Sequence, residues 1–278
     1  MKYLKVLVRS FIDFFKDGGL MLAGSISYFS MMALVPLCLF LITVFGYILG
    51  HYHSFYDFFS ARLISLFPDI TKGITKELGK LINFKGMGSF SIVLYAILSF
   101  QVFSSMESAL NKIFEVKKKR SFLWSVVLSL TMVTLLIILI LVSFVATSLI
   151  PLLRTLMKGF PGLGIGILTS FLIRYVIPFF MVLFTITGIY IFFPKTKVRF
   201  SNAFAGAFFS ALFLEAAKHI FTFYVGTVVK FGTIYGPLTA FIVFLLWAFY
   251  SSCILLIGAE IVHNLITHKK HSPGVSRH

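Results

Sequence analysis

Long apolar runs without a charged residue limit what this chain can fold into, and residues 122–150 form one of them. That run exceeds the roughly 20 apolar residues with which an α-helix crosses the hydrocarbon core of a bilayer. Charged residues make up 12% of the chain and hydrophobic residues 59%, whereas about 25% of the residues in soluble domains are charged. The sequence therefore indicates a polytopic membrane protein.

Six segments have the length and apolar character of membrane-spanning helices. We expect these spans at about 26–49, 88–110, 122–150, 173–193, 200–228 and 234–259. Proline interrupts the first span at Pro36, lies near the start of the fourth at Pro178 and ends the fourth at Pro194. The predicted fold is an all-α membrane helix bundle, in which residues 23–262 form a single six-span transmembrane domain.

Amphipathic segments accompany the predicted spans. Residues 1–22 are expected to form a helix in the membrane interface, because their apolar and charged side chains recur at helical spacing. The apolar face carries Leu4, Leu7, Val8, Phe11, Phe14 and Phe15, and the polar face carries Lys2, Lys5, Arg9, Asp13 and Lys16. The outer 50–87 connection is expected to hold two short amphipathic helices, over 55–67 and 69–84, which either cap a cavity mouth or pack on the membrane surface. Residues 263–278 are expected to form a basic, disordered tail.

Lysine and arginine are distributed unequally between the two sides of the predicted bundle. Five lie in the loop 111–121 and three in the turn 194–199, whereas the much longer 50–87 loop holds five. Because short loops rich in lysine and arginine remain in the cytoplasm, both termini are predicted to be cytoplasmic. The net charge of +16 is interpreted as complementing anionic lipid headgroups, and no nucleic-acid partner is expected.

An ionisable cluster lies inside the predicted fifth span. Glu215 is followed by Lys218 and His219 at the i+3 and i+4 spacings that favour pairing on a helix. Arg174, at the outer start of the fourth span, is expected at a similar depth in the bilayer. Because charged groups in a span must face protein or water, we consider two interpretations. The four residues form either a net-positive cavity for an anionic substrate headgroup, which the surplus positive charge favours, or a self-neutralising group that holds the fifth helix in the bundle.

A second set of polar side chains is predicted to line one side of the second span and the start of the first. This polar stripe comprises Gln101, Ser104, Ser105, Glu107, Ser108 and Asn111 from the second span, with Ser25 and Tyr28 from the first. Interhelical hydrogen bonding is favoured over a conduit, because hydroxyl and amide side chains commonly join transmembrane helices. The first and second spans are therefore expected to pair there.

Two further features concern helix packing. The fifth span carries a series of small residues that permits close approach of a neighbouring helix, namely Ala203, Ala205, Gly206, Ala207 and Ala211. Glu260, at the end of the sixth span, is expected to form a structural ion pair with a basic residue of the 194–199 turn.

Five stretches of the sequence carry a family resemblance. They are SISYFSMMALVP (25–36), ALNKIFEV (109–116), YIFFPKTKVRFSNAFAGA (190–207), EAAKHIFTFYV (215–225) and YGPLTAFIVFLLWAFYSSCILLIGAEI (235–261). In this order they resemble the YihY/BrkB-type bacterial inner-membrane proteins, once grouped under the label ribonuclease BN, and the resemblance covers nearly the whole chain. It implies a six-span inner-membrane protein with proposed roles in envelope biogenesis, serum resistance and movement of lipids or other amphiphiles. No set of catalytic residues comes with the resemblance.

The residues themselves argue against a nuclease. RNA hydrolysis requires metals held by clustered ligands or a positioned acid–base pair. The nine acidic residues are scattered along the chain, and His51 and His53 lack further histidines nearby. The histidines near the end of the chain, His263, His268 and His271, do not form a tight metal-binding motif. No enzymatic activity, metal or cofactor is therefore expected.

Three functions are open on the sequence. The favoured one is transport or flipping of an anionic lipid or another amphiphile in envelope biogenesis. The second is a non-transporting scaffold for envelope assembly, and the third is a proton-coupled carrier of a small solute that uses Glu215 and His219 as a relay. Anionic membrane lipids are the expected partners, and a homo-oligomer or envelope-assembly partners are compatible with each function.

Overall fold

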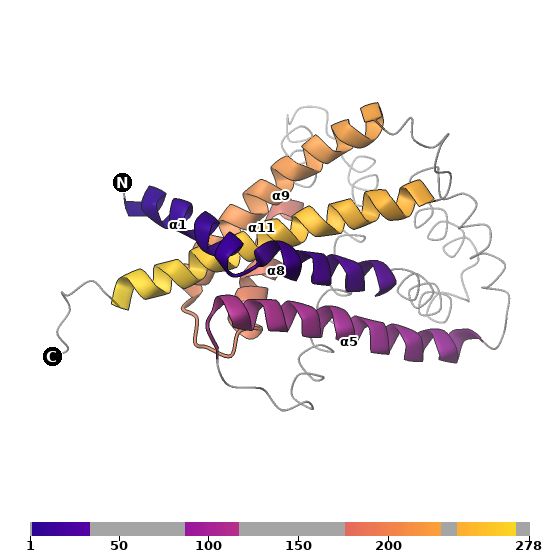
Figure 1. The fold of residues 1–278 in the computed structure, drawn as a ribbon, viewed down its shortest axis with the longest axis horizontal. Coiled ribbons are helices and arrows are strands. Elements are labelled where there is room, and N and C mark those ends of the chain that lie inside the picture. Colours follow the sequence, from indigo (N-terminus) through magenta and orange to yellow (C-terminus); the bar gives the residue numbers. More distant parts are fainter. Residues whose placement is uncertain (1, 34–86, 117–175, 229–237, 271–278) are drawn as a thin grey trace, which may run out of the picture. The chain divides into compact units, whose positions relative to one another are not determined.

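The computed structural model describes residues 2–33, 87–116, 176–228 and 238–270, and the regular secondary structure in these ranges is helical (Figure 1). The predicted all-α fold is therefore confirmed for the described part of the chain. The predicted third span, the 50–87 connection as far as residue 86, Pro36 and Arg174 lie outside these residues.

The described helices overlap five of the six predicted spans, and the bounds agree best for the second and the fifth. They are α1 (Lys2–Lys16), a helix over Gly19–Ala33, α5 (Met87–Ile113), α8 (Ile177–Phe192), α9 (Phe200–Val228) and α11 (Leu238–Lys270). Phe200–Tyr224 of α9 and Phe241–Thr267 of α11 are long and apolar enough to cross a membrane, whereas Gly19–Ala33 and Pro178–Phe192 are shorter apolar helices. The count of six spans stays a prediction.

The N-terminal amphipathic helix ends earlier than the sequence predicted. It was expected over residues 1–22, but α1 ends at Lys16 and the next helix begins at Gly19. The reason is Gly18, whose φ of +71° lies in the left-handed region that residues with a Cβ atom rarely adopt. The amide of Gly18 still bonds to the Phe15 carbonyl, at 3.2 Å, before the chain turns into the following helix.

The end of the chain is more regular than expected. Residues 263–278 were predicted to be a disordered tail, but α11 continues as a helix to Lys270. The extension is stabilised by tertiary contacts, because Val262 and Asn264 are buried and the Asn264 amide bonds to α1. The sequence pattern of α11 alone did not reveal these contacts.

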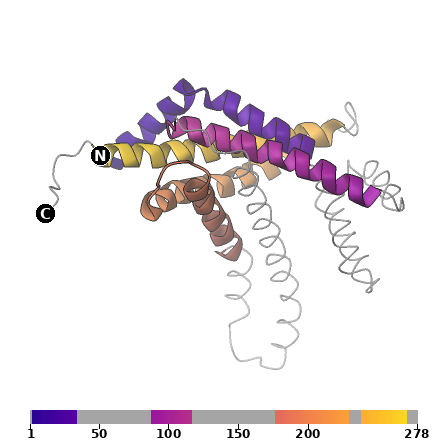
Figure 2. The same cartoon turned by 90° about the horizontal axis from the view of Figure 1, so that it is seen from below.

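The chain divides into two compact units, and three helices contribute to both. The first unit holds α1, α8, α5 from Glu107, α9 as far as Glu215 and α11 from Ile254. The second unit holds the remaining parts of α5, α9 and α11 together with the helix Gly19–Ala33. Within the first unit, α1 lies across the C-terminal part of α11 (Figures 1 and 2).

Close packing between α8, α9 and α11 forms the core of the first unit. Gly206 on α9 faces Gly258 and Val262 on α11, so tightly that a Cβ atom on Gly206 would collide with them. The small-residue series expected to admit a neighbouring helix thus does so, and α11 is that neighbour. The Tyr190 hydroxyl of α8 donates to the Leu255 carbonyl at 2.6 Å and lies 2.9 Å from the Ser210 hydroxyl of α9.

Aromatic rings and a pair of serines hold the second unit together. The ring of Phe221 on α9 lies 5.1 Å from that of Trp247 and 5.5 Å from that of Tyr250, both on α11. The hydroxyl oxygens of Ser25 and Ser105 are 2.9 Å apart and join the helix Gly19–Ala33 to α5. The contact expected between the first two spans is thus present at this position.

Candidate functional site

The ionisable cluster predicted in the fifth span lies on one continuous helix. Glu215, Lys218 and His219 all belong to α9, so their i+3 and i+4 spacing places them on one face. Lys218 and His219 are exposed and Glu215 is half-buried. The Thr222 hydroxyl, one turn further on, donates to the Lys218 carbonyl at 2.8 Å. Arg174 lies outside the described residues, so its place beside this face stays a prediction.

The surroundings of this face are apolar. Ile220 and Phe223 of the same helix turns are 70% and 74% exposed, and Phe213 one turn earlier is exposed as well. Because the Phe200–Tyr224 stretch has the length and hydropathy of a membrane span, these side chains are suited to lipid contact. Basic and apolar side chains are thus exposed on the same turns of one helix.

The C-terminal end of the predicted polar stripe on α5 makes packing contacts. Glu107 is buried, and its Oε1 lies 3.5 Å from Lys195 Nζ, an ion pair rather than a short hydrogen bond. The backbone amide of Lys195 donates to Asn111 Oδ1 at 3.1 Å. Together these contacts hold the segment after α8 against the end of α5.

The remaining members of the stripe are less enclosed. Gln101, Ser108 and Tyr28 are exposed and Ser104 is half-buried. Ser25 and Ser105 form the hydroxyl pair described above. The Ser25–Ser105 pair is an interhelical contact of the kind that the sequence favoured, whereas Glu107 and Asn111 contact the segment after α8. A conduit through the others stays a hypothesis.

Glu260 lies in a different environment from the one predicted. It was expected to pair with the 194–199 turn, but Lys195 in that turn contacts Glu107 instead. Glu260 is buried, and the carboxyl groups of Asp13 and Asp17 lie near it. The cause is the docking of α1 on α11 through Asn264, which brings Asp13 and Asp17 close to Glu260.

The end of α5 contains a feature that sequence reasoning missed. The Val116 amide bonds to the Asn111 carbonyl at 2.9 Å and the Glu115 amide to the Lys112 carbonyl at 3.0 Å, which is the Schellman pattern of helix termination. Glu115 has a φ of 51° at the position where glycine is usual. The sequence did not indicate this helix end, because the ALNKIFEV stretch has a glutamate where a glycine would mark the turn.

The described residues do not contain a candidate metal site. Among residues 2–33, 87–116, 176–228 and 238–270, no three His, Cys, Asp or Glu side chains are grouped closely enough to hold a metal ion. His51, His53 and His271 lie outside those ranges.

Comparison with known proteins identifies relatives over nearly the full length. A sequence profile of the family described as Virulence factor BrkB matches residues 11–275. A UPF0761 membrane protein of Mannheimia succiniciproducens is 27% identical over 270 residues, which cover 94% of this chain and 90% of the relative. A UPF0761 membrane protein of Haemophilus influenzae is 27% identical, with 87% of this chain and 88% of the relative covered.

Some relatives are longer than this chain. A UPF0761 membrane protein of Kangiella koreensis is 25% identical over 95% of this chain but only 64% of its own length. No solved structure matches the chain.

Proposed function

This chain belongs to the BrkB family of membrane proteins, and we propose that it transports or flips an anionic lipid, or another anionic amphiphile, during assembly of the bacterial envelope. Its membrane location follows from the family and agrees with the two helices, α9 and α11, that are long and apolar enough to span a bilayer. The activity is inferred from the chemistry of α9.

The observation that carries the proposal is the exposure of basic side chains within an apolar helix. Lys218 and His219 are exposed on the Phe200–Tyr224 stretch of α9. A charged side chain at the centre of a span costs about 2.5–3.5 kcal/mol on insertion scales. A water-filled path or an anionic group beside the helix would offset that cost, which supports a path for a charged headgroup.

An amphiphile fits this helix better than a wholly polar solute. Its headgroup requires a positive, solvated position, which Lys218 and the predicted neighbour Arg174 would supply against the negative charge of Glu215. Its acyl chains require apolar surface, and Ile220 and Phe223 expose it on the same helix. The same turns of α9 thus offer both kinds of contact, with Lys218 and the two apolar residues on different sides of the helix.

The proposal includes a multi-pass arrangement in the bacterial cytoplasmic membrane with both termini in the cytoplasm. It is supported by the density of lysine and arginine in the loop 111–121 and in the turn 194–199.

A non-transporting scaffold is the competing function, and one observation favours it. The close contact of Gly206 with Gly258, together with the buried hydrogen bonds of Tyr190, makes a tightly packed group of α8, α9 and α11. In a scaffold, the ionisable residues of α9 would serve stability alone.

Reconstitution tests the two functions directly. The full chain is placed in phosphatidylcholine vesicles with a trace of fluorescent phosphatidylglycerol, and the label reaching the outer leaflet is bleached with dithionite. We expect wild-type protein to accelerate bleaching of the inner-leaflet label over protein-free vesicles. Lys218→Met and Arg174→Met should each slow this step about tenfold per folded molecule, the loss that corresponds to about 1.4 kcal/mol of barrier.

Controls separate transport from stability. Lys197→Met removes an exposed lysine outside α9 and should leave the rate unchanged. If the cluster is purely structural, Lys218→Met should lower the melting temperature, and Glu215→Gln with Lys218→Met should restore it, while the rate per folded molecule stays at the wild-type value. That result, or no acceleration by wild-type protein, would reject the transport function.

A further inference from the structure

Helix α1 borders two hollows that share a common ridge, formed by Val8 and Ile12. The first, here called the cationic hollow, is lined by residues of α1 alone, including Lys5, Arg9 and Lys16. The second, here called the apolar groove, lies between α1, α9 and α11 and has a volume of about 540 Å³. Besides the ridge, its lining consists of Leu7, Phe11, Phe15, Phe209, Phe213 and Ile257.

The apolar groove exists because α1 has more apolar surface than its docking contact covers. Val6, Ser10 and Phe14, spaced four residues apart, are buried against the bundle. Leu7, Phe11 and Phe15 follow on the adjacent face with the same spacing and are exposed. Opposite them stand Phe209 and Phe213 of α9, so the groove has aromatic walls on both sides.

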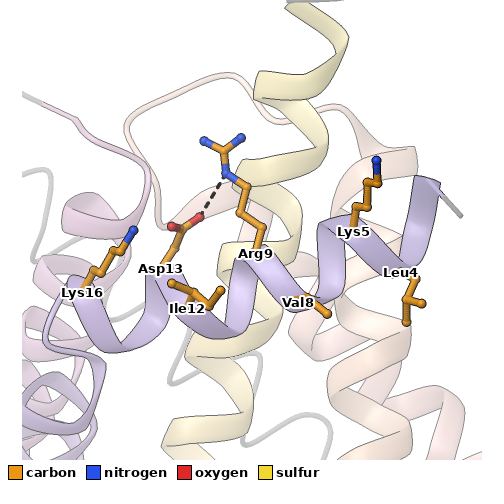
Figure 3. Close-up of a pocket in the computed structure, with 7 residues that line it drawn as sticks. All are labelled: Leu4, Lys5, Val8, Arg9, Ile12, Asp13 and Lys16. Carbon is orange, nitrogen blue, oxygen red and sulfur yellow. Dashed lines mark ion pairs between the residues drawn. The ribbon is translucent and has the colours of Figure 1, made fainter.

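The cationic hollow has a surplus of positive charge. Lys5, Arg9 and Lys16 are exposed around it, and the carboxylate present is that of Asp13, 3.5 Å from Arg9 Nε. In Figure 3, Lys5 and Arg9 project to one side of α1, while Leu4, Val8 and Ile12 project away from them. An anion on this side would therefore meet two basic side chains one helical turn apart.

We propose that the two hollows together bind one anionic phospholipid. An acyl chain occupies the apolar groove, the glycerol backbone crosses the ridge of Val8 and Ile12, and the phosphate lies against Lys5 and Arg9. The site uses none of the ionisable residues of α9, so it does not depend on transport taking place.

Charge and polarity together identify this occupant. The groove is lined by hydrocarbon and aromatic side chains alone, so a bound protein segment would leave its backbone amides and carbonyls without partners there. An acyl chain has no such groups. The adjoining surplus of positive charge favours a headgroup with net negative charge over a zwitterionic one.

Native mass spectrometry of the purified full chain in an uncharged detergent tests the site. The protein is mixed with equal amounts of phosphatidylglycerol and phosphatidylcholine that carry identical acyl chains, and the retained lipids are counted. We expect wild-type protein to retain phosphatidylglycerol preferentially. Lys5→Gln with Arg9→Gln should lower the ratio of retained phosphatidylglycerol to retained phosphatidylcholine. The expected decrease is roughly fivefold per cation removed, or about 25-fold for the double variant.

Matched variants make the result specific. Lys197→Gln with Arg199→Gln removes two exposed cations elsewhere and should leave the ratio unchanged. Phe11→Ala should reduce retention of both lipids roughly tenfold. Phe184→Ala on α8 is the matched control, because the two phenylalanines are similarly exposed, at 50% and 56%, and it should leave retention unchanged. Arg9→Lys keeps the charge and should keep the preference.

Several outcomes would overturn the proposal. One is equal retention of the two lipids by wild-type protein, and another is an equal loss of preference in the control pair, which would indicate general attraction to a basic protein. Loss of a co-purified protein in Phe11→Ala, with lipid retention unchanged, would make the groove a protein-docking face. Circular dichroism and gel filtration of every variant show that the comparison is between folded molecules.

Discussion

The Asn264 side-chain amide donates to the Ser10 hydroxyl oxygen at 3.1 Å and thereby joins residues 254 positions apart in the chain. Both side chains are buried, and the same amide also reaches Asp13 Oδ2 at 3.0 Å. The Ser10 hydroxyl in turn donates to the Val6 carbonyl of its own helix. This contact anchors α1 on α11 and so sets the wall of the apolar groove.

Replacing Asn264 should loosen that anchor. Asn264→Ala removes both hydrogen bonds to α1, and we expect a loss of about 1–3 kcal/mol in the free energy of unfolding. Thr185→Ala is the control, because the Thr185 hydroxyl bonds only to the Met181 carbonyl of its own helix among the contacts described and should matter less. Unfolding in mixed micelles measures both. Equal losses in the two variants would contradict a special role for Asn264.

The contact between Gly206 and Gly258 predicts a steric effect. A Cβ atom on Gly258 would collide with the Ser210 and Tyr190 hydroxyls, so Gly258→Ala should destabilise the protein by about 1–3 kcal/mol. Gly24 offers a matched control, because a Cβ atom there meets nothing within 4 Å. Gly24→Ala should leave stability unchanged or raise it by up to about 1 kcal/mol. The melting temperature should therefore fall in Gly258→Ala and stay the same or rise in Gly24→Ala.

The ion pair of Glu107 and Lys195 predicts strong coupling between the two positions. Lys195→Met leaves the buried Glu107 without its basic partner, which should cost up to about 3–5 kcal/mol of stability. The double variant with Glu107→Gln should recover most of that loss. A double-mutant cycle measures the interaction, and additive effects would show that the pair contributes nothing.

The end of α5 predicts a stabilising substitution. Glu115 occupies the left-handed position of a Schellman turn, where a Cβ atom costs about 1–2 kcal/mol. Glu115→Gly should therefore raise the melting temperature, whereas Glu115→Ala removes the same charge and keeps the strain. If alanine stabilises the protein as much as glycine, the charge rather than the backbone is responsible.

Topology is testable by thiol labelling of intact cells. In a background with Cys38→Ala and Cys253→Ala, Ser54→Cys should react with a membrane-impermeant reagent. Lys117→Cys should react only after the membrane is permeabilised, because the loop 111–121 is rich in lysine and arginine. Labelling of Lys117→Cys in intact cells would reverse the proposed orientation.

The class and many helix bounds of this protein were predictable because they depend on local sequence. The predicted fifth span, 200–228, coincides with α9, and Pro178 and Pro194 bracket α8 as proline does at helix ends. The charged face of α9 was predictable too, since helical spacing alone brings Glu215, Lys218 and His219 to one side.

Tertiary structure decided which side chains meet. The sequence predicted that the 194–199 turn pairs with Glu260, but Lys195 of that turn contacts Glu107, because the segment after α8 lies against the end of α5. Docking of α1 brought Asp17 near Glu260, buried Asn264 of α11 and created the apolar groove. Helix formation follows from backbone hydrogen bonds between residues four positions apart, so sequence alone determined it. Contacts such as Asn264 with Ser10 join distant residues, and only the packing of whole helices brings those together.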